Sequence, residues 1–175
     1  FNGAVSPFDF TVTDDLGRSS PVAAVTIQVT PVNDAPTATS GIVVGTEDDA
    51  SIPVSLRGVD TEDGIGVTVT ITSLPPAAKG VLYLPDGTTP VVEGTALTAA
   101  DASQLVFVPA SNYNTATDGP VDIPFTVTDS GVDSTVSGAP LTSTPGSFKI
   151  DILPVNDTPV ATPATLSGAE DAPVS

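Results

Sequence analysis

A six-residue motif that occurs twice sets the framework of this chain. Residues 31–36 read Pro-Val-Asn-Asp-Ala-Pro and residues 154–159 read Pro-Val-Asn-Asp-Thr-Pro, 123 positions apart. Each copy follows a segment in which apolar and polar residues alternate, and each ends in a proline, which holds a linker extended. A fixed period of this size predicts a tandem array of domains and not one large fold.

The repetition extends on both sides of the motif. The matching positions in the same register are Val25, Ile27 and Val29 with Phe148, Ile150 and Ile152, and Gly45, Glu47 and Asp48 with Gly168, Glu170 and Asp171. A further block, Phe-Thr-Val-Thr-Asp, occupies residues 10–14 and residues 125–129, only 115 positions apart. The difference of eight predicts an eight-residue insertion in the loop between the last two strands of the second copy.

This register divides the chain into one complete repeat and two partial ones. We expect residues 1–30 to be the C-terminal strands of a first β-sandwich, 31–36 a linker, 37–153 a complete β-sandwich, 154–159 a second linker and 160–175 the N-terminal strand of a third repeat. The chain begins at Phe1, without a recognisable signal peptide or membrane span. We therefore expect it to be part of a longer protein.

The residues between the linkers predict an all-β fold. Valine, threonine and isoleucine dominate the periodic segments, proline and glycine separate them, and no long segment shows helical periodicity. The clearest alternation lies at residues 67–72, 105–108, 123–127 and 148–152. Roughly seven such strands predict two packed antiparallel sheets, an immunoglobulin-like Greek-key sandwich. Its expected core is modest, with Phe107, Phe125 and Phe148 inside and Tyr83 and Tyr113 at the margins.

The charge and the missing residue types exclude several functions. The chain has 21 acidic and four basic residues, a net charge of −17, and neither cysteine nor histidine. Disulfides are therefore excluded, and zinc lacks its usual cysteine and histidine ligands. Nucleic acids and anionic membranes are disfavoured, because the chain lacks the basic residues that would bind their phosphates. The usual catalytic nucleophile and base pairs are also missing, so we do not expect an enzyme. Such acidity is compatible either with solubility in a salty medium or with bound cations.

The acidic residues are expected to gather at the two ends of the complete sandwich. At the end of the first linker, Asn33 and Asp34 should meet the loop after the second strand and the end of the sixth strand, which carry Asp60, Glu62, Asp63 and Asp129. At the other end, Asn156 and Asp157 should meet Glu47 and the loop between the fifth and sixth strands, which carries Asp118 and Asp122. Oxygen ligands from loops and a linker favour calcium (Ca²⁺), which accepts about six to eight oxygens in flexible geometry.

These motifs carry a family resemblance. The segments TVTDDLG, VTIQVTPVNDAP, GTEDDA, GVDTEDG and FTVTDSG resemble the cadherin-like repeats of large bacterial surface and secreted proteins, including repeats-in-toxin adhesins. The resemblance implies calcium ligands that correspond to the family's linker Asn-Asp, lone Glu, DxD loop and final Asp: Asn33, Asp34, Asn156, Asp157, Glu47, Glu170, Asp60, Glu62, Asp14 and Asp129. Pro31 and Pro154 replace the first linker Asp of that pattern, and Ala35 and Thr158 replace its last Asn. Fewer ions per joint than in a full cadherin are therefore implied.

Two functions remain open from the sequence. The first is a structural repeat of an extracellular stalk, adhesin or filament, whose partners are the neighbouring repeats and possibly other copies in a fibre. The second is a binding module that recognises a glycan or a protein through residues 130–146 or 85–94. The partial repeats at the two ends either belong to a continuous array or are completed by strand donation between chains. An extracellular location, at the cell surface or secreted, is expected in both cases, and calcium is expected in the first.

Overall fold

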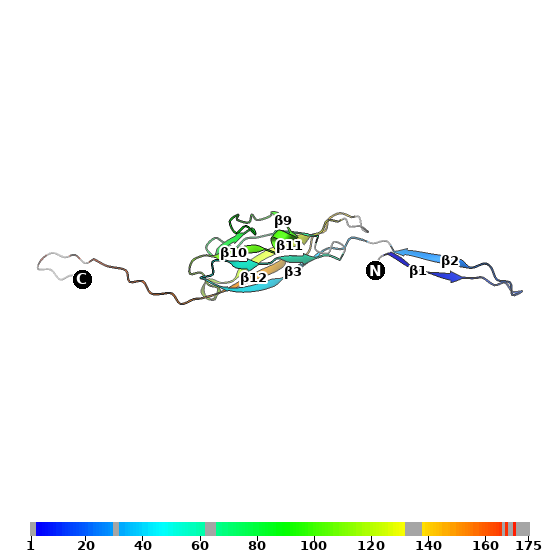
Figure 1. The fold of residues 1–175 in the computed structure, drawn as a ribbon, viewed down its shortest axis with the longest axis horizontal. Helices are drawn as coiled ribbons and strands as arrows, with labels where there is room; N and C mark the ends of the chain where they lie inside the picture. The colour runs from blue at the N-terminus through cyan, green and yellow to red at the C-terminus, as the bar shows by residue number, and fades with distance from the viewer. Residues whose placement is uncertain are drawn as a thin grey trace.

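The computed structural model describes residues 3–29, 32–61, 66–131, 138–165, 167 and 170. They form fourteen elements, with a β-sandwich between two extended segments (Figure 1). The strands are β1 Gly3–Phe10, β2 Ala23–Val29, β3 Thr37–Thr39, β4 Gly41–Thr46, β5 Ile52–Val54, β6 Arg57–Val59, β7 Thr68–Ile71, β8 Gly80–Tyr83, β9 Ala96–Thr98, β10 Leu105–Pro109, β11 Val121–Thr128 and β12 Gly146–Leu153. The helices are α1 Ala99–Ala102 and α2 Thr115–Asp118.

The sandwich consists of strands β3 to β12. One sheet has the order β4-β12-β11-β7-β9 and another has the order β5-β10-β8, while β3 and β6 form a short additional pair. All pairs are antiparallel except β4 with β12, which are parallel. The expectation of about seven strands was too simple, because the first strand is divided into β3 and β4, the second into β5 and β6, and β9 is added.

The close approach of β4 to β12 depends on a glycine. A methyl group at Gly41 would lie 2.7 Å from Cε2 of Phe148, so a larger side chain would have to displace the ring. Gly41 follows Ser40, the residue at which the chain leaves β3 and its partner β6 to join β12. The first strand can therefore serve both layers of the sandwich.

The alternating segments form the core, as predicted from their period. Along β11 every second residue is buried, and Phe107 and Phe125 are fully buried at the centre. Phe148 is also buried, and Tyr83 lies half-buried at the margin, as expected. Tyr113 lies deeper than expected: it is buried, and its hydroxyl donates to the Gly119 carbonyl at 2.5 Å.

Two one-turn helices interrupt the β structure. Thr98 caps α1 by accepting a hydrogen bond from the Asp101 amide at 3.1 Å, and Asn114 caps α2 by accepting one from the Thr117 amide at 3.2 Å. Threonine and asparagine are favoured at this position because their side-chain oxygens satisfy otherwise free amides. Helices this short leave no periodic signal in the sequence, so neither could be predicted from periodicity.

The β1–β2 hairpin stands apart from the sandwich and repeats the β11–β12 pair (Figure 1). In the hairpin the Ser20 amide donates to the Val12 carbonyl at 2.8 Å, and the Val12 amide donates to Ser20 Oγ at 3.1 Å. In the sandwich Ser143 and Val127 make the same two bonds, at 2.8 and 3.0 Å. The two hairpins are therefore built in the same way.

The loop insertion predicted from the two offsets is confirmed at the ends of these hairpins. Asp14 and Arg18, four positions apart, exchange a backbone bond of 2.9 Å and a bond of 2.8 Å from the Arg18 amide to the Asp14 carboxylate. Asp129 and Leu141, twelve positions apart, exchange the same bonds at 3.1 and 2.8 Å. The eight additional residues therefore lie between Asp129 and Leu141.

The turn after β8 supports a prediction about acid stability. Asp86 Oδ1 accepts the Thr88 and Thr89 amides, each at 2.8 Å, and Oδ2 accepts the Thr89 hydroxyl at 2.5 Å. The Thr89 side chain is the largest cause that lowers the pKa of Asp86 from 3.8 to about 2. Since the folded state favours the carboxylate, this contribution to stability is present above pH 3.8 and is lost as the pH falls toward 2.

We expect the pKa of Asp86 to rise toward its ordinary value in Thr89→Val. This substitution removes the hydroxyl whose hydrogen bond lowers that pKa most. Thr88→Val is the matched control, since the Thr88 amide still donates and the Thr88 side chain contributes least to the lowered pKa of Asp86. An NMR titration of the carboxyl carbons measures both shifts. Equal pKa values of Asp86 in the two variants would contradict this interpretation.

Candidate linker joints

The first linker is attached to the sandwich by the side chain of Asn33. Its Nδ2 donates to Asp129 Oδ2 at 3.1 Å and to the Ala139 carbonyl at 3.2 Å. Ala139 belongs to the inserted loop, and a methyl group at the adjacent Gly138 would lie 3.1 Å from Asn33 Cβ. The insertion therefore packs on the linker. We call Asn33, Asp34, Asp60, Asp129 and Ala139 the first joint.

Asp129 holds the first joint together. Its side chain is buried, with 5% of the residue exposed, and its second carboxylate oxygen, Oδ1, accepts the Leu141 amide at 2.8 Å. One oxygen therefore closes the β11–β12 loop while the other receives the linker. Hydrogen bonds to a buried carboxylate are stronger than those between neutral groups, so this residue couples the loop to the linker.

Asp60 lies at the same end of the sandwich as Asp129. A methyl group at Gly58 would lie 2.5 Å from Val127, so β6 and β11 touch there, and each aspartate follows two residues later. Asp60 is buried and Asp34 is exposed. The sequence predicted that Asn33 meets Asp129, and the hydrogen bond between their side chains is present. Glu62 and Asp63, which belong to the same prediction, lie outside the described residues.

The second linker is attached to the other end of the sandwich by Glu47. Its Oε1 accepts the amide of Val155, the second residue of the linker, at 2.7 Å. Its Oε2 accepts Asn114 Nδ2 at 3.3 Å, and its own amide donates to the Leu153 carbonyl at 3.1 Å. The placement of Glu47 beside the second linker, as the sequence predicted, is confirmed. We call Glu47, Asn114, Asp118 and Val155 the second joint.

Asp118 belongs to the second joint through the α2 cap. Its Oδ2 accepts the Asn114 amide at 3.2 Å and the Thr117 hydroxyl at 3.1 Å. The helix is also bound to β12, since Thr115 Oγ1 donates to Asp151 and accepts the Ile152 amide at 3.2 Å. Asn114, Thr115 and Asp151 are residues that the sequence analysis missed. An Asn two positions before Ala-Thr-Asp is a helix-cap signal that could have indicated the first of them.

The remaining predicted ligands are less closely placed. Asp122 was assigned to a loop, and that assignment is wrong: it is the second residue of β11, exposed and paired in register with Lys149 of β12. The early start of β11 after Pro120 carries it into the sheet. Asn156 and Asp157 are exposed on the linker. Among the described residues, three or more Asp, Glu, His or Cys side chains nowhere gather closely enough to hold a metal ion.

Tyr113 gives the second joint a dependence on alkaline pH. Burial, and then the negative charge of Asp118, raise the pKa of the Tyr113 hydroxyl above 10. Since the folded state favours the protonated hydroxyl, its contribution to stability is complete below about pH 10 and decreases as the pH rises further. We expect Tyr113→Phe to remove this alkaline loss and Asp118→Asn to reduce it, as measured by urea denaturation between pH 8 and 11. If the free energy of unfolding of Tyr113→Phe fell with rising pH as steeply as that of the unchanged protein, the assignment to Tyr113 would be contradicted.

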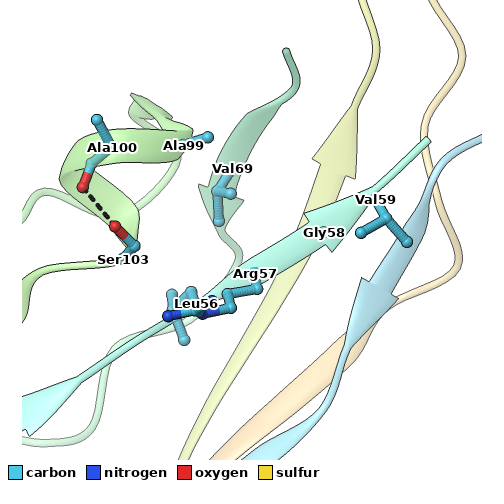
Figure 2. Close-up of a pocket in the computed structure, with 8 residues that line it drawn as sticks. All are labelled: Leu56, Arg57, Gly58, Val59, Val69, Ala99, Ala100 and Ser103. Carbon is cyan, nitrogen blue, oxygen red and sulfur yellow. Dashed lines mark hydrogen bonds between the residues drawn. The ribbon is translucent and has the colours of Figure 1, made fainter. Parts of the chain in front are cut away.

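A hollow of the sandwich lies between β6, β7 and the α1 region (Figure 2). It has a volume of about 310 Å³ and is lined by Leu56, Arg57, Gly58, Val59, Val69, Ala99, Ala100 and Ser103. Figure 2 shows mostly small and apolar side chains around it, from β6, β7, α1 and the residues next to them, together with Arg57. Its lining contains one charged residue, Arg57, and no carboxylate, so it offers calcium no carboxylate ligand.

Comparison with known proteins supports the fold. No family model and no curated protein sequence matches the chain. Among solved structures, the extracellular cadherin domains 1–4 of protocadherin gamma B7 match with a TM-score of 0.50 and 17% identity, over 85% of this chain and 31% of that one. The cadherin domains 1–5 of protocadherin gamma B2 match with a TM-score of 0.48 and 16% identity, over 87% and 27%. EC22-24 of mouse cadherin-23 match with a TM-score of 0.45 and 17% identity, over 79% and 37%.

These similarities define the class of the fold. The chain contains an all-β, cadherin-like sandwich, as the sequence predicted. It spans less than two fifths of the length of each of the three structures described above. Among the described residues, the helices are too short to cross a membrane.

Proposed function

We propose that this chain is a structural segment of an extracellular bacterial stalk, adhesin or filament, in which cadherin-like repeats are held in line at their linkers by calcium. One observation carries the proposal: each linker is bound by a carboxylate at its own end of the sandwich, the first by Asp129 and the second by Glu47. A module that holds the chain on both sides transmits its orientation to its neighbours.

The oxygens of the first joint support a hard cation there. Two oxygens, from Asp129 and from the Ala139 carbonyl, converge on one electropositive group, the amide nitrogen of Asn33. A cation attracts oxygens in the same way, and buried Asp60 lies at the same end. Asp129, Asp60, the Ala139 carbonyl and the amide oxygen of Asn33 would hold the ion. When bound, calcium supplies positive charge that several oxygens share.

The charge of the whole chain favours the same function. A net charge of −17 on 175 residues opposes the close approach of successive repeats. The buried carboxylates of Asp60 and Asp129 at the first joint add to this cost locally unless a cation neutralises them. The hydrogen bonds from Asn33 and Val155 attach the linkers. At the first joint calcium would replace the Asn33 bonds, because the Asn33 amide has to turn for its oxygen to face the ion.

The hairpin supports the tandem arrangement. Because β1–β2 repeats the bonds of β11–β12, residues 1–30 fit the C-terminal strands of a preceding sandwich, and residues 160–175 fit the first strand of a following one. Neighbouring repeats of the same protein are then the partners of residues 37–153. The resemblance to bacterial surface repeats is the reason for assigning the stalk to bacteria.

A calcium titration followed by NMR tests the proposal. We expect calcium, and not magnesium, to shift the amides around Asp129 and Asn33 with a dissociation constant of about 10⁻⁴ to 10⁻³ M. Asp129→Asn should weaken this response, whereas Asp9→Asn, which removes the same charge from the hairpin, should not. Equal responses to the two cations, or to calcium in the two variants, would refute a calcium site at the first joint.

A further inference from the structure

Strand β6 of the sandwich has one edge that no strand covers within the described part of the chain. β6 pairs with β3, and the two form a separate two-stranded sheet. The preceding strand β5 pairs with β10, which begins at Leu105 opposite Val54. An extension of β10 toward its N-terminus would run beside β6, but the chain forms α1 there instead. The edge of β6 that this extension would meet is therefore left without a strand partner.

The hollow described above lies along this edge (Figure 2). The Leu56 amide donates to the Ala102 carbonyl at 2.9 Å, which joins the start of β6 to the end of α1. Beyond that bond the two segments diverge, and among the described residues the backbone of 57–59 pairs with β3 alone. One wall of the hollow is therefore strand backbone, which is a template for another strand.

The inner side of the hollow is apolar. Its lining includes Leu56 and Val69, both fully buried. Gly58 adds no side chain there: a methyl group on it would lie 2.5 Å from Val127, so this position of β6 faces the interior of the sandwich. The lining from α1 and the residue after it consists of alanine and serine. An apolar side chain from an added strand would thus fill space that the sandwich leaves empty.

The outer rim of the hollow carries a positive charge. Arg57 precedes Gly58 on β6, so its side chain points to the opposite side of the strand, where it is exposed. Its Nε donates to Ser55 Oγ at 3.0 Å. Among the described residues the one ion pair joins Arg18 to Asp14, so Arg57 pairs with no carboxylate there. A chain with 21 acidic and four basic residues thus presents an unpaired cation beside an apolar hollow.

We propose that the free edge of β6 and the hollow beside it bind an extended segment of a separate partner protein, which adds to β6 as a further strand. Apolar side chains of that segment enter the hollow, and a carboxylate on its opposite side meets Arg57. The described extended segments of this chain are poor candidates, because Pro36 in the first and Pro154, Pro159 and Pro163 in the second have no amide to donate. The occupant is therefore another protein and not a second copy.

This binding role goes beyond the proposed stalk and does not depend on calcium. None of the residues that line the hollow belongs to either joint. The site also differs from the loops 130–146 and 85–94, where the sequence placed a possible binding function. Binding of the partner strand should therefore persist in EDTA, and a failure of calcium to bind at the first joint would leave it intact.

A peptide titration of the full chain, followed by NMR in EDTA, tests the proposal. The probe is acetyl-Thr-Val-Asp-Val-Thr-Val-amide, which alternates apolar and polar side chains and carries one carboxylate. We expect it to shift the amides of residues 57–59 and of α1. The same peptide with every amide N-methylated keeps its side chains but cannot donate to β6, so it should bind much more weakly. No shift at residues 57–59 even at millimolar peptide, or equal binding of the two peptides, would overturn the proposal.

Charge reversal tests the role of Arg57. Arg57→Glu should weaken binding of the peptide by about tenfold or more, the range for hydrogen bonds to charged groups. A peptide with lysine in place of aspartate should recover the lost affinity. Lys149→Glu, the same change of charge at an exposed position of β12, is the matched control and should leave the affinity unchanged. Equal affinities of the two variants for the aspartate peptide would contradict the assignment of the carboxylate to Arg57.

Filling the hollow tests whether apolar side chains enter it. Ala100→Leu places a larger side chain at an exposed position of the lining and should abolish peptide binding. Ala116→Leu, the same substitution at an exposed position of α2, should have no effect. Sedimentation without peptide identifies the alternative occupant. A mean mass that rises with concentration, and that Ala100→Leu returns to the monomer, would show that a second copy fills the hollow and would overturn the proposal.

Discussion

Asp129→Ala is expected to lower the free energy of unfolding of the sandwich by about 2–3 kcal/mol, the range for bonds to a buried charged acceptor. The carboxylate is buried, and its loss leaves the Leu141 amide and the Asn33 side chain without their acceptor. Denaturation in urea, followed by circular dichroism in the presence of EDTA, measures this effect without any contribution from calcium.

Asp14→Ala is the matched control, because Asp14 occupies the equivalent place in the hairpin. It accepts the Arg18 amide at 2.8 Å and pairs with the Arg18 side chain at 3.2 Å, but its side chain is 40% exposed. Exposed ion pairs contribute little, so the sandwich should lose less than about 0.5 kcal/mol. Similar losses in the two variants would show that burial at the first joint does not matter.

Phe125→Ala is expected to have the largest effect, a loss of about 3–5 kcal/mol from the cavity that it leaves in a packed core. Phe125 is fully buried in β11, and its ring lies 3.2 Å from the position of a methyl group at Gly146. Phe10→Ala, at the equivalent position of the hairpin, changes the same side chain where it is 44% exposed. It should leave the unfolding of the sandwich unchanged.

Urea denaturation of the two variants measures both effects. A large loss of sandwich stability in Phe10→Ala would show that the hairpin packs on the sandwich and would contradict the contrast between the two positions.

The repeat explains why so much of the fold could be predicted. Two copies of one pattern fix the register, so the alternating strands, the eight-residue insertion and the opposite placement of Asn33 and Glu47 followed from the spacing alone. The position of Asp122 did not follow, because the alternating pattern was recognised only from residue 123, whereas β11 already begins at Val121, directly after Pro120. The division of the first strand at Ser40 was hidden for the same reason.

The joints were predicted less completely than the strands. Carboxylates can be recognised from the residue types in a sequence. The Ala139 carbonyl and the Leu141 and Val155 amides cannot, because they belong to the backbone. Asn114 acts both as a helix cap and as a donor to Glu47, 67 positions away, a contact that only tertiary structure provides. The sequence therefore indicates which acids lie at each end, and the fold determines which donors they meet.

The distance distribution across the first joint tests the account most directly. Spin labels at Gln28→Cys in β2 and Lys149→Cys in β12, both exposed positions in a chain without other cysteines, report the orientation of the hairpin relative to the sandwich by double electron–electron resonance. The account predicts a narrow distribution in calcium, a broader one in EDTA, and a broad one in both conditions when Asp129→Ala is added. Distributions of equal width in calcium, in EDTA and in Asp129→Ala would contradict a joint stiffened by calcium.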